Sequence, residues 1–211
     1  MASQYAQQIW NALKADIGNE YGVAGLMGNL QAESGLIPFR VQGDFSEGYS
    51  DSLAYTEWVD SGAVSEQDFV NREQGYGLAQ WTFFTRKQGL YDMKRSMNLS
   101  IGSVEVNVAY LLYELKTHFN SVYTILQLAT SIREASDWVL YVFENPADQS
   151  ESVAQMRASL GEEIYAEFSG SGGGSGGGSG GGNTPTKPRK KGFNFILFGN
   201  KQRMIQTRRI R

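Results

Sequence analysis

The stretch from Val23 to Pro38, VAGLMGNLQAESGLIP, constrains the fold most, because it joins an apolar helical face to a single carboxylate. Apolar residues at helical spacing predict a core-facing helix here: Val23, Leu26, Met27 and Leu30. Gly35 and Pro38 end that helix. Glu33 follows on or beside the apolar face, where an ionised carboxyl loses hydration. We therefore expect a raised pKa and general acid chemistry, and the alternative is a Glu that simply points into water.

Small residues also line this helix. Gly25, Gly28 and Ala32 form a ridge on which another backbone can approach closely.

Composition excludes several classes of site. The chain has no Cys, so it has no disulfide framework and no thiolate metal site. Its single His, His118, argues against a His-rich metal cluster and a Ser-His-Asp triad, and favours a helix cap or surface position. No apolar run approaches the roughly 20 residues of a membrane span. We expect no metal, no cofactor and no membrane span. No signal peptide is visible, so we expect that an export signal or virion context lies outside this sequence.

Charge and glycine content divide the 211 residues into three parts. Residues 1–169 contain all 22 acidic residues and ten basic ones, a net charge of −12, and we interpret them as the folded domain. Residues 170–182, GSGGGSGGGSGGG, are typical of the flexible linkers of engineered fusions. Residues 183–211 hold nine basic residues and no acidic one.

The basic segment 183–211 is expected to be a fused peptide derived from a protein partner. Its charge complements the −12 domain, and Phe193–Phe198 supplies an apolar run able to anchor a complex. The alternative is a cationic tail that draws the chain onto anionic cell walls or membranes. A nucleic-acid partner is disfavoured, because the acidic domain repels phosphates.

Hydrophobic periodicity predicts a mainly α fold. The first helix, capped by Ser3, buries Tyr5, Ile9, Trp10 and Leu13, and later helices run over 85–97, after Ser103, after Ser131 with Glu134 in a capping box, and from Ser150 towards Phe168. Residues 39–75 are polar and predict an irregular excursion bordering a cleft. Ser65 and Asp68 resemble a short-helix cap there, and Tyr55, Trp58 and Phe69 are its anchors.

A second motif, GYGLAQWT, spans Gly75 to Thr82. Its glycines predict a tight turn or a small β-hairpin. Gln80 and Trp81 suit a sugar site, because an amide bonds hydroxyl and acetamide groups and an indole stacks on a pyranose. The alternative is a glycine turn that carries a core tryptophan.

Three blocks taken together resemble the phage tail-type lysozyme family, within the lysozyme-like and lytic-transglycosylase superfamily. They are MGNLQAESG with Pro38 (residues 27–38), GYGLAQWT (75–82) and YVFENPADQS (141–150). Residues 33–34 and 77–80 look like the Glu-Ser and Gly-Leu-Met-Gln signatures of goose-type and soluble lytic enzymes. The resemblance covers residues 1–168 and implies a lysozyme-like helical fold.

The resemblance also implies a function. Glu33 corresponds to the catalytic acid, which protonates the β-1,4 glycosidic oxygen between N-acetylmuramic acid and N-acetylglucosamine. Gln80 and Trp81 are expected to line the saccharide groove, with Tyr76 and Glu144 in the same cleft. The partner is then the glycan strand of peptidoglycan, and the place of action is extracellular, at the cell wall or in a phage tail.

The sequence leaves two questions open. A hydrolase needs a second carboxylate, for which the excursion offers Asp44, Glu47, Asp51 and Glu57, whereas a lytic transglycosylase needs none because the 6-hydroxyl of the sugar closes a ring. The competing function is a catalytically weak lysozyme-fold module that serves as a binding or assembly partner for the fused peptide.

Overall fold

Helix α2 (Glu20–Ser34) packs against the first helix and against the last three α-helices of the described residues, and its packing is the most extensive in the domain. The computed structural model describes residues 4–170, so the Ser3 cap, nearly all of the expected linker and the fused peptide lie outside the described residues. The apolar stripe of α2 is confirmed, because Val23, Leu26, Met27 and Leu30 are all fully buried. Asn19 caps its first turn through a hydrogen bond from the Tyr21 amide.

The glycines of α2 let neighbouring backbones approach it closely. A methyl group added at Gly28 would lie 2.4 Å from the carbonyl oxygen of Arg157, and one added at Gly25 would lie 2.6 Å from Ala135. These close approaches seat α9 (Glu151–Phe168) and α8 (Ile132–Trp138) directly on α2. The prediction that Ala32 extends this ridge is wrong, because Ala32 is exposed.

Of the remaining helices, four match predicted ones: α1 (Ala6–Ile17), α4 (Glu66–Asn71), α5 (Phe84–Met97) and α6 (Val104–Thr117). Two were not predicted: α3 (Ser50–Ser61) and α7 (Asn120–Leu128). Ile9, Trp10 and Leu13 of α1 are buried as expected. His118 is the exposed C-terminal cap residue of α6.

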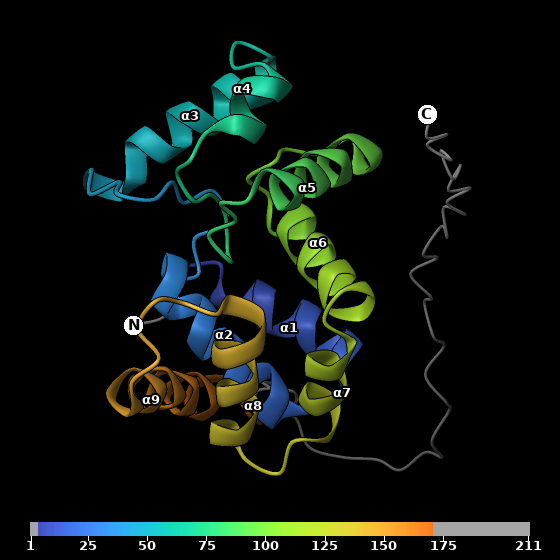
Figure 1. Cartoon of the computed structure of the whole chain (residues 1–211), viewed down its shortest axis with the longest axis vertical. Helices are drawn as coiled ribbons and strands as arrows, with labels where there is room; N and C mark the ends of the chain where they lie inside the picture. The colour runs from blue at the N-terminus through green and yellow to red at the C-terminus, as the bar shows by residue number, and fades with distance from the viewer. Residues whose placement is uncertain (1–3, 171–211) are drawn as a thin grey trace, which may run out of the picture. The chain divides into compact units, whose positions relative to one another are not determined.

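The segment 39–75 is more regular than its polarity indicates. It contains helices α3 and α4, and Ser65 caps α4 through the Asp68 amide as predicted. Tyr55 and Phe69 anchor it in the core, but Trp58 is exposed, so its role as an anchor is wrong. Figure 1 shows α3 and α4 grouped with α5, and α6 descending from this group towards α7.

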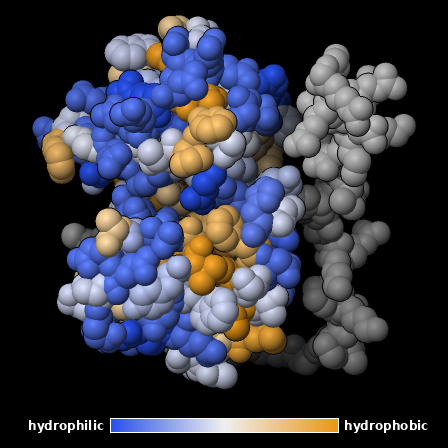
Figure 2. Space-filling view, viewed as in Figure 1, coloured by the Kyte–Doolittle hydropathy of each residue, from blue (hydrophilic) through white to orange (hydrophobic). Residues whose placement is uncertain are grey.

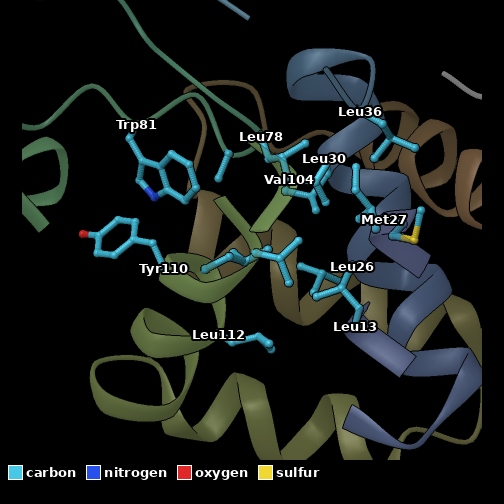
Figure 3. Close-up of a cluster of buried hydrophobic side chains, with 14 of the residues drawn as sticks. Leu13, Leu26, Met27, Leu30, Leu36, Leu78, Trp81, Val104, Tyr110 and Leu112 are labelled. Atoms are coloured by element: carbon cyan, nitrogen blue, oxygen red, sulfur yellow. The ribbon is translucent and has the colours of Figure 1, made fainter. Parts of the chain in front are cut away.

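The GYGLAQWT motif forms the only hairpin-like turn among the described residues. Tyr76 and Trp81 exchange backbone hydrogen bonds across Gly77–Gln80, and Tyr76 pairs on its other side with Val41. Leu78 from this turn enters the core beside Leu30 and Val104 (Figure 3). The turn therefore joins the excursion to the helical core, and the predicted mainly α fold with a small β element is confirmed.

Candidate active site

Glu33 stands in the last turn of α2, where the chain changes direction sharply. Gly35 takes a left-handed conformation with φ of 66°, as the predicted C-cap requires, and Leu36 follows with φ of 59°. The Glu33 side chain keeps 22% of its surface exposed, and its Oε1 accepts a hydrogen bond of 2.6 Å from Nη2 of Arg157. A carboxylate at a helix C-terminus faces the negative end of the helix dipole. The guanidinium of Arg157 compensates for this.

Arg157 is held by a buried polar chain. Its Nη1 donates to Oδ1 of Asn29 over 3.2 Å, and the amide nitrogen of Asn29 donates to Gly25 and Ser136. Asn29 and Ser136 are fully buried, and the Arg157 side chain is 8% exposed. Its Nε is buried and has no hydrogen-bond partner in the part of the chain that the structure describes. Arg157 thereby connects α9 to α2 and fixes the orientation of Glu33.

Glu33 opens into a pocket of about 420 Å³, within the size range of small-ligand sites. The pocket lies between residues distant in sequence and is lined by Glu33, Gln42, Ala79, Gln80, Thr82, Phe83, Arg86, Glu144 and Pro146. The structure thus brings three of the predicted site residues together: Glu33, Gln80 and Glu144. Figure 2 shows small apolar areas within a mostly hydrophilic surface on the face viewed.

Glu144 is the second carboxyl of this pocket. It ends the π-helix η2 (Val139–Glu144), and Asn145 then turns the chain with φ of 46°. Although the side chain retains some exposed surface, its Oε1 is buried and has no hydrogen-bond partner within residues 4–170. Burial and the nearby charge of Glu33 raise the pKa of Glu144 to about 8, against the opposing influence of Arg86 and Arg157. A carboxyl group of this kind holds its proton at neutral pH.

Gln80 lines the pocket from the hairpin turn. Its backbone has φ of 45°, and its amide nitrogen donates to the carbonyl oxygens of Arg40 and Gly77. Both amide hydrogens therefore hold the turn in place. The Oε1 atom is what remains to accept a hydrogen bond from a bound molecule.

Trp81 and Tyr76 do not serve as predicted. Trp81 is fully buried, packs on Tyr110 and donates its Nε1 to Oε2 of Glu114 over 2.7 Å (Figure 3). Tyr76 is also buried, with its hydroxyl 2.7 Å from Oγ1 of Thr56. Neither ring has a free face for a sugar, so their expected contact with saccharide is wrong in this structure. The glycines that flank Tyr76 let the turn fold inwards, which supports the alternative of a glycine turn with a core tryptophan.

The excursion does not bring its carboxylates to the pocket. Burial alone would raise the pKa of Asp44, but hydrogen bonds donated by Ser46 and Ser52 outweigh it and hold the pKa well below its usual range. Asp44 thereby holds the segment before α3 against the first turn of that helix. Glu47, Asp51 and Glu57 are exposed and are absent from the pocket lining.

Sequence reasoning missed three residues of the site: Arg157, Arg86 and Phe83. Arg157 stands inside a helix with no local motif around it. Arg86 forms a two-pronged ion pair with Glu114 at 2.7 and 2.8 Å and also lines the pocket. Phe83 is 66% exposed, and its position in an aromatic pair with Phe84 directly after GYGLAQWT was the available signal.

Comparison with known families decides the class of protein. The model of the phage tail lysozyme family matches residues 4–168. The chain belongs to the phage tail lysozyme family. The lysozyme domain is therefore a peptidoglycan-cleaving enzyme in the general sense, and its context is a phage virion or another setting in which cell wall is degraded. A comparison with curated proteins gives no match.

Among residues 4–170, no cluster of three His, Cys, Asp or Glu side chains is arranged to hold a metal ion. No helix described for the chain has both the length and the apolar character to cross a membrane.

Proposed function

We propose that this lysozyme domain cleaves the β-1,4 bond between N-acetylmuramic acid and N-acetylglucosamine, with Glu33 as the general acid. The observation that carries the proposal is the opening of Glu33 into a pocket shared with Gln80, the two residues that the family signatures assign to the site. The carboxyl group delivers a proton to the glycosidic oxygen as the bond to the anomeric carbon breaks.

The remaining pocket residues supply recognition in this proposal. Oε1 of Gln80 accepts a hydrogen bond from a sugar hydroxyl or acetamide N–H, because its amide hydrogens are already engaged. Phe83 provides the exposed aromatic face that Trp81 does not, and a pyranose ring lies against it. The polar edge of the pocket at Gln42 and Thr82 suits a hydroxyl-rich ligand.

The test is Glu33→Gln, which keeps the side-chain volume and removes the acidic proton. We expect loss of turbidity clearing on purified peptidoglycan by about 10²–10⁴-fold, the usual contribution of general acid–base catalysis. The exposed carboxylate variant Glu57→Gln is the matched control and should clear the suspension at the unchanged rate. Full activity in folded Glu33→Gln would refute the assignment of Glu33. Wild-type protein that binds peptidoglycan without clearing it would favour the catalytically weak binding module.

A further inference from the structure

We propose that Glu144 is the second catalytic carboxyl of this enzyme, the base that activates the attacking water while Glu33 protonates the leaving oxygen. The inference rests on the proposed function of Glu33. It also commits the enzyme to hydrolysis. In a lytic transglycosylase the 6-hydroxyl of the substrate sugar attacks in place of water, so no base is needed to activate water.

Position selects Glu144. The pocket lining contains two carboxyl groups, Glu33 from the end of α2 and Glu144 from the end of η2. The carboxylates of the excursion are excluded, because Asp44 is committed to the Ser46 and Ser52 hydrogen bonds and the others lie outside the pocket. Glycosidases that use two carboxyls place them on opposite sides of the scissile bond, which a pocket lined by both groups allows.

Hydrogen bonding also marks Glu144. Its Oε1 is a buried polar atom with no partner among the described residues, an arrangement that is costly in a folded protein. A structural carboxyl at such a depth is normally satisfied by protein donors. The half-buried side chain lines the pocket and its carboxyl is not committed to a protein donor at Oε1, so it is free to turn towards a water molecule or substrate, as a base requires.

Charge then distributes the protons between the two groups. Four charged side chains act on Glu144: Glu33 of α2, Arg86 of α5, Glu114 of α6 and Arg157 of α9. Arg157 pairs directly with Glu33, whereas Glu144 has no ion pair among the described residues. In the resting enzyme Glu144 therefore holds the proton, while the guanidinium of Arg157 pairs with Glu33.

The proposed cycle returns the enzyme to this resting state. Glycan binding is accompanied by transfer of the proton from Glu144 to Glu33 within the pocket. Glu33 then gives it to the oxygen of the breaking bond, and N-acetylglucosamine leaves with a free 4-hydroxyl. The ionised Glu144 takes a proton from water, whose oxygen bonds to the anomeric carbon of muramic acid. One water is consumed, and the proton is again on Glu144 with Glu33 paired to Arg157.

Azide rescue of the full-length chain tests this role, because azide is an anionic nucleophile that needs no base. Glu144→Ala and the volume-matched Glu144→Gln should each lose about 10²–10⁴-fold in rate on purified peptidoglycan. Sodium azide should restore at least tenfold of the rate of Glu144→Ala and give muramyl azide, detected by mass spectrometry. Glu33→Ala should not be rescued, since its leaving oxygen still lacks a proton. Wild-type digests should carry reducing muramic ends, with one ¹⁸O atom when the reaction runs in H₂¹⁸O.

The outcomes separate the two proposals. Loss of clearing in Glu33→Gln together with a wild-type rate in Glu144→Gln would overturn the base assignment and leave Glu33 as the acid. Anhydro-muramic ends in the wild-type digest would do the same without any variant. Absence of muramyl azide from folded Glu144→Ala would also count against a base. Full activity in Glu33→Gln, or wild-type protein that binds peptidoglycan without clearing it, would remove the proposed function itself.

Discussion

Two carboxyl groups with buried oxygens, Glu114 and Glu144, lie near Arg86. Comparing them distinguishes a carboxyl that stabilises the fold from one that is available for catalysis. Glu114 accepts four hydrogen bonds, from Trp81, Tyr110 and two nitrogens of Arg86. Glu144 has a buried oxygen with none. Both side chains come from helical segments and both are near the same guanidinium. The difference is that the hydrogen bonds donated by Trp81, Tyr110 and Arg86 all go to Glu114.

The contrast teaches that burial alone does not identify a functional carboxyl. Glu114 is the more deeply buried residue, yet its network joins α5, α6 and the hairpin turn and leaves no acceptor open for substrate. Glu144 is destabilising to bury and opens into the pocket. Its lack of partners is a cost to folding that a catalytic role explains.

The largest expected effect is a loss of stability when Glu114 is replaced. Glu114→Gln removes one partner of a buried ion pair and leaves Arg86 uncompensated, so it should lower the free energy of unfolding by about 3–5 kcal/mol. Glu144→Gln breaks no protein hydrogen bond and should leave that free energy unchanged or raise it. Urea unfolding followed by circular dichroism measures both.

The exposed pair of Glu66 and Arg95 gives the control for this experiment. Glu66→Gln should leave the free energy of unfolding nearly unchanged, because exposed ion pairs contribute little to stability. An equal loss from Glu114→Gln and Glu144→Gln would contradict the comparison, because it would mean that Glu144 is as firmly paired as Glu114.

The next effect is a dependence of stability on pH. The pKa of Glu144 rises from 4.5 to about 8 on folding, so between these values the native state keeps a proton that the unfolded state has lost. Stability from this group therefore falls as pH rises from about 5 to 8, by a few kcal/mol at most, and changes little outside that window.

Urea unfolding at intervals from pH 5 to 8 checks this slope. The wild-type free energy of unfolding should decrease across the series, and Glu144→Gln should remove most of the decrease. Asp44 does not interfere, because its lowered pKa makes its contribution fall only as pH drops below about 4. A slope that is identical in wild type and Glu144→Gln would show that Glu144 is ionised at neutral pH.

Much of the fold could be predicted because local patterns dictate it. The apolar spacing of α2, its Gly35 cap and the serine caps of α6 and α8 are short-range signals that the structure confirms. Helix α3 escaped prediction because its residues are largely polar and only Ser52, Tyr55, Thr56 and Val59 reach the interior. Its stability comes from tertiary contacts that a polar sequence does not display.

The sequence motifs predicted which segments form the site, but not which side chains contact one another there. Glu33, Gln80 and Glu144 come from three segments that the sequence marked, and they line one pocket. The orientation of side chains within the GYGLAQWT turn could not be predicted from the motif alone. It depends on a residue distant in sequence, because Trp81 is buried with its indole N–H bonded to Glu114 of α6. Arg157 reaches Glu33 only because Gly28 lets α9 pack closely on α2.

The smallest expected effect sharpens a second contrast, between the exposed ring of Phe83 and the buried ring of Trp81. Phe83→Ala should change the free energy of unfolding by about 0.5 kcal/mol or less, because the ring is exposed. It should raise KM for soluble glycan strands severalfold, the loss expected for one aromatic contact of about 0.5–1.5 kcal/mol.

Trp81→Phe should instead cost about 1–3 kcal/mol of stability, because Glu114 loses a buried donor, with KM unchanged. Phe84→Ala is the matched control, since Phe84 is exposed beside Phe83 but does not line the pocket. A raised KM in folded Trp81→Phe, with Phe83→Ala silent, would return the sugar contact to Trp81 and require the turn to open when glycan binds.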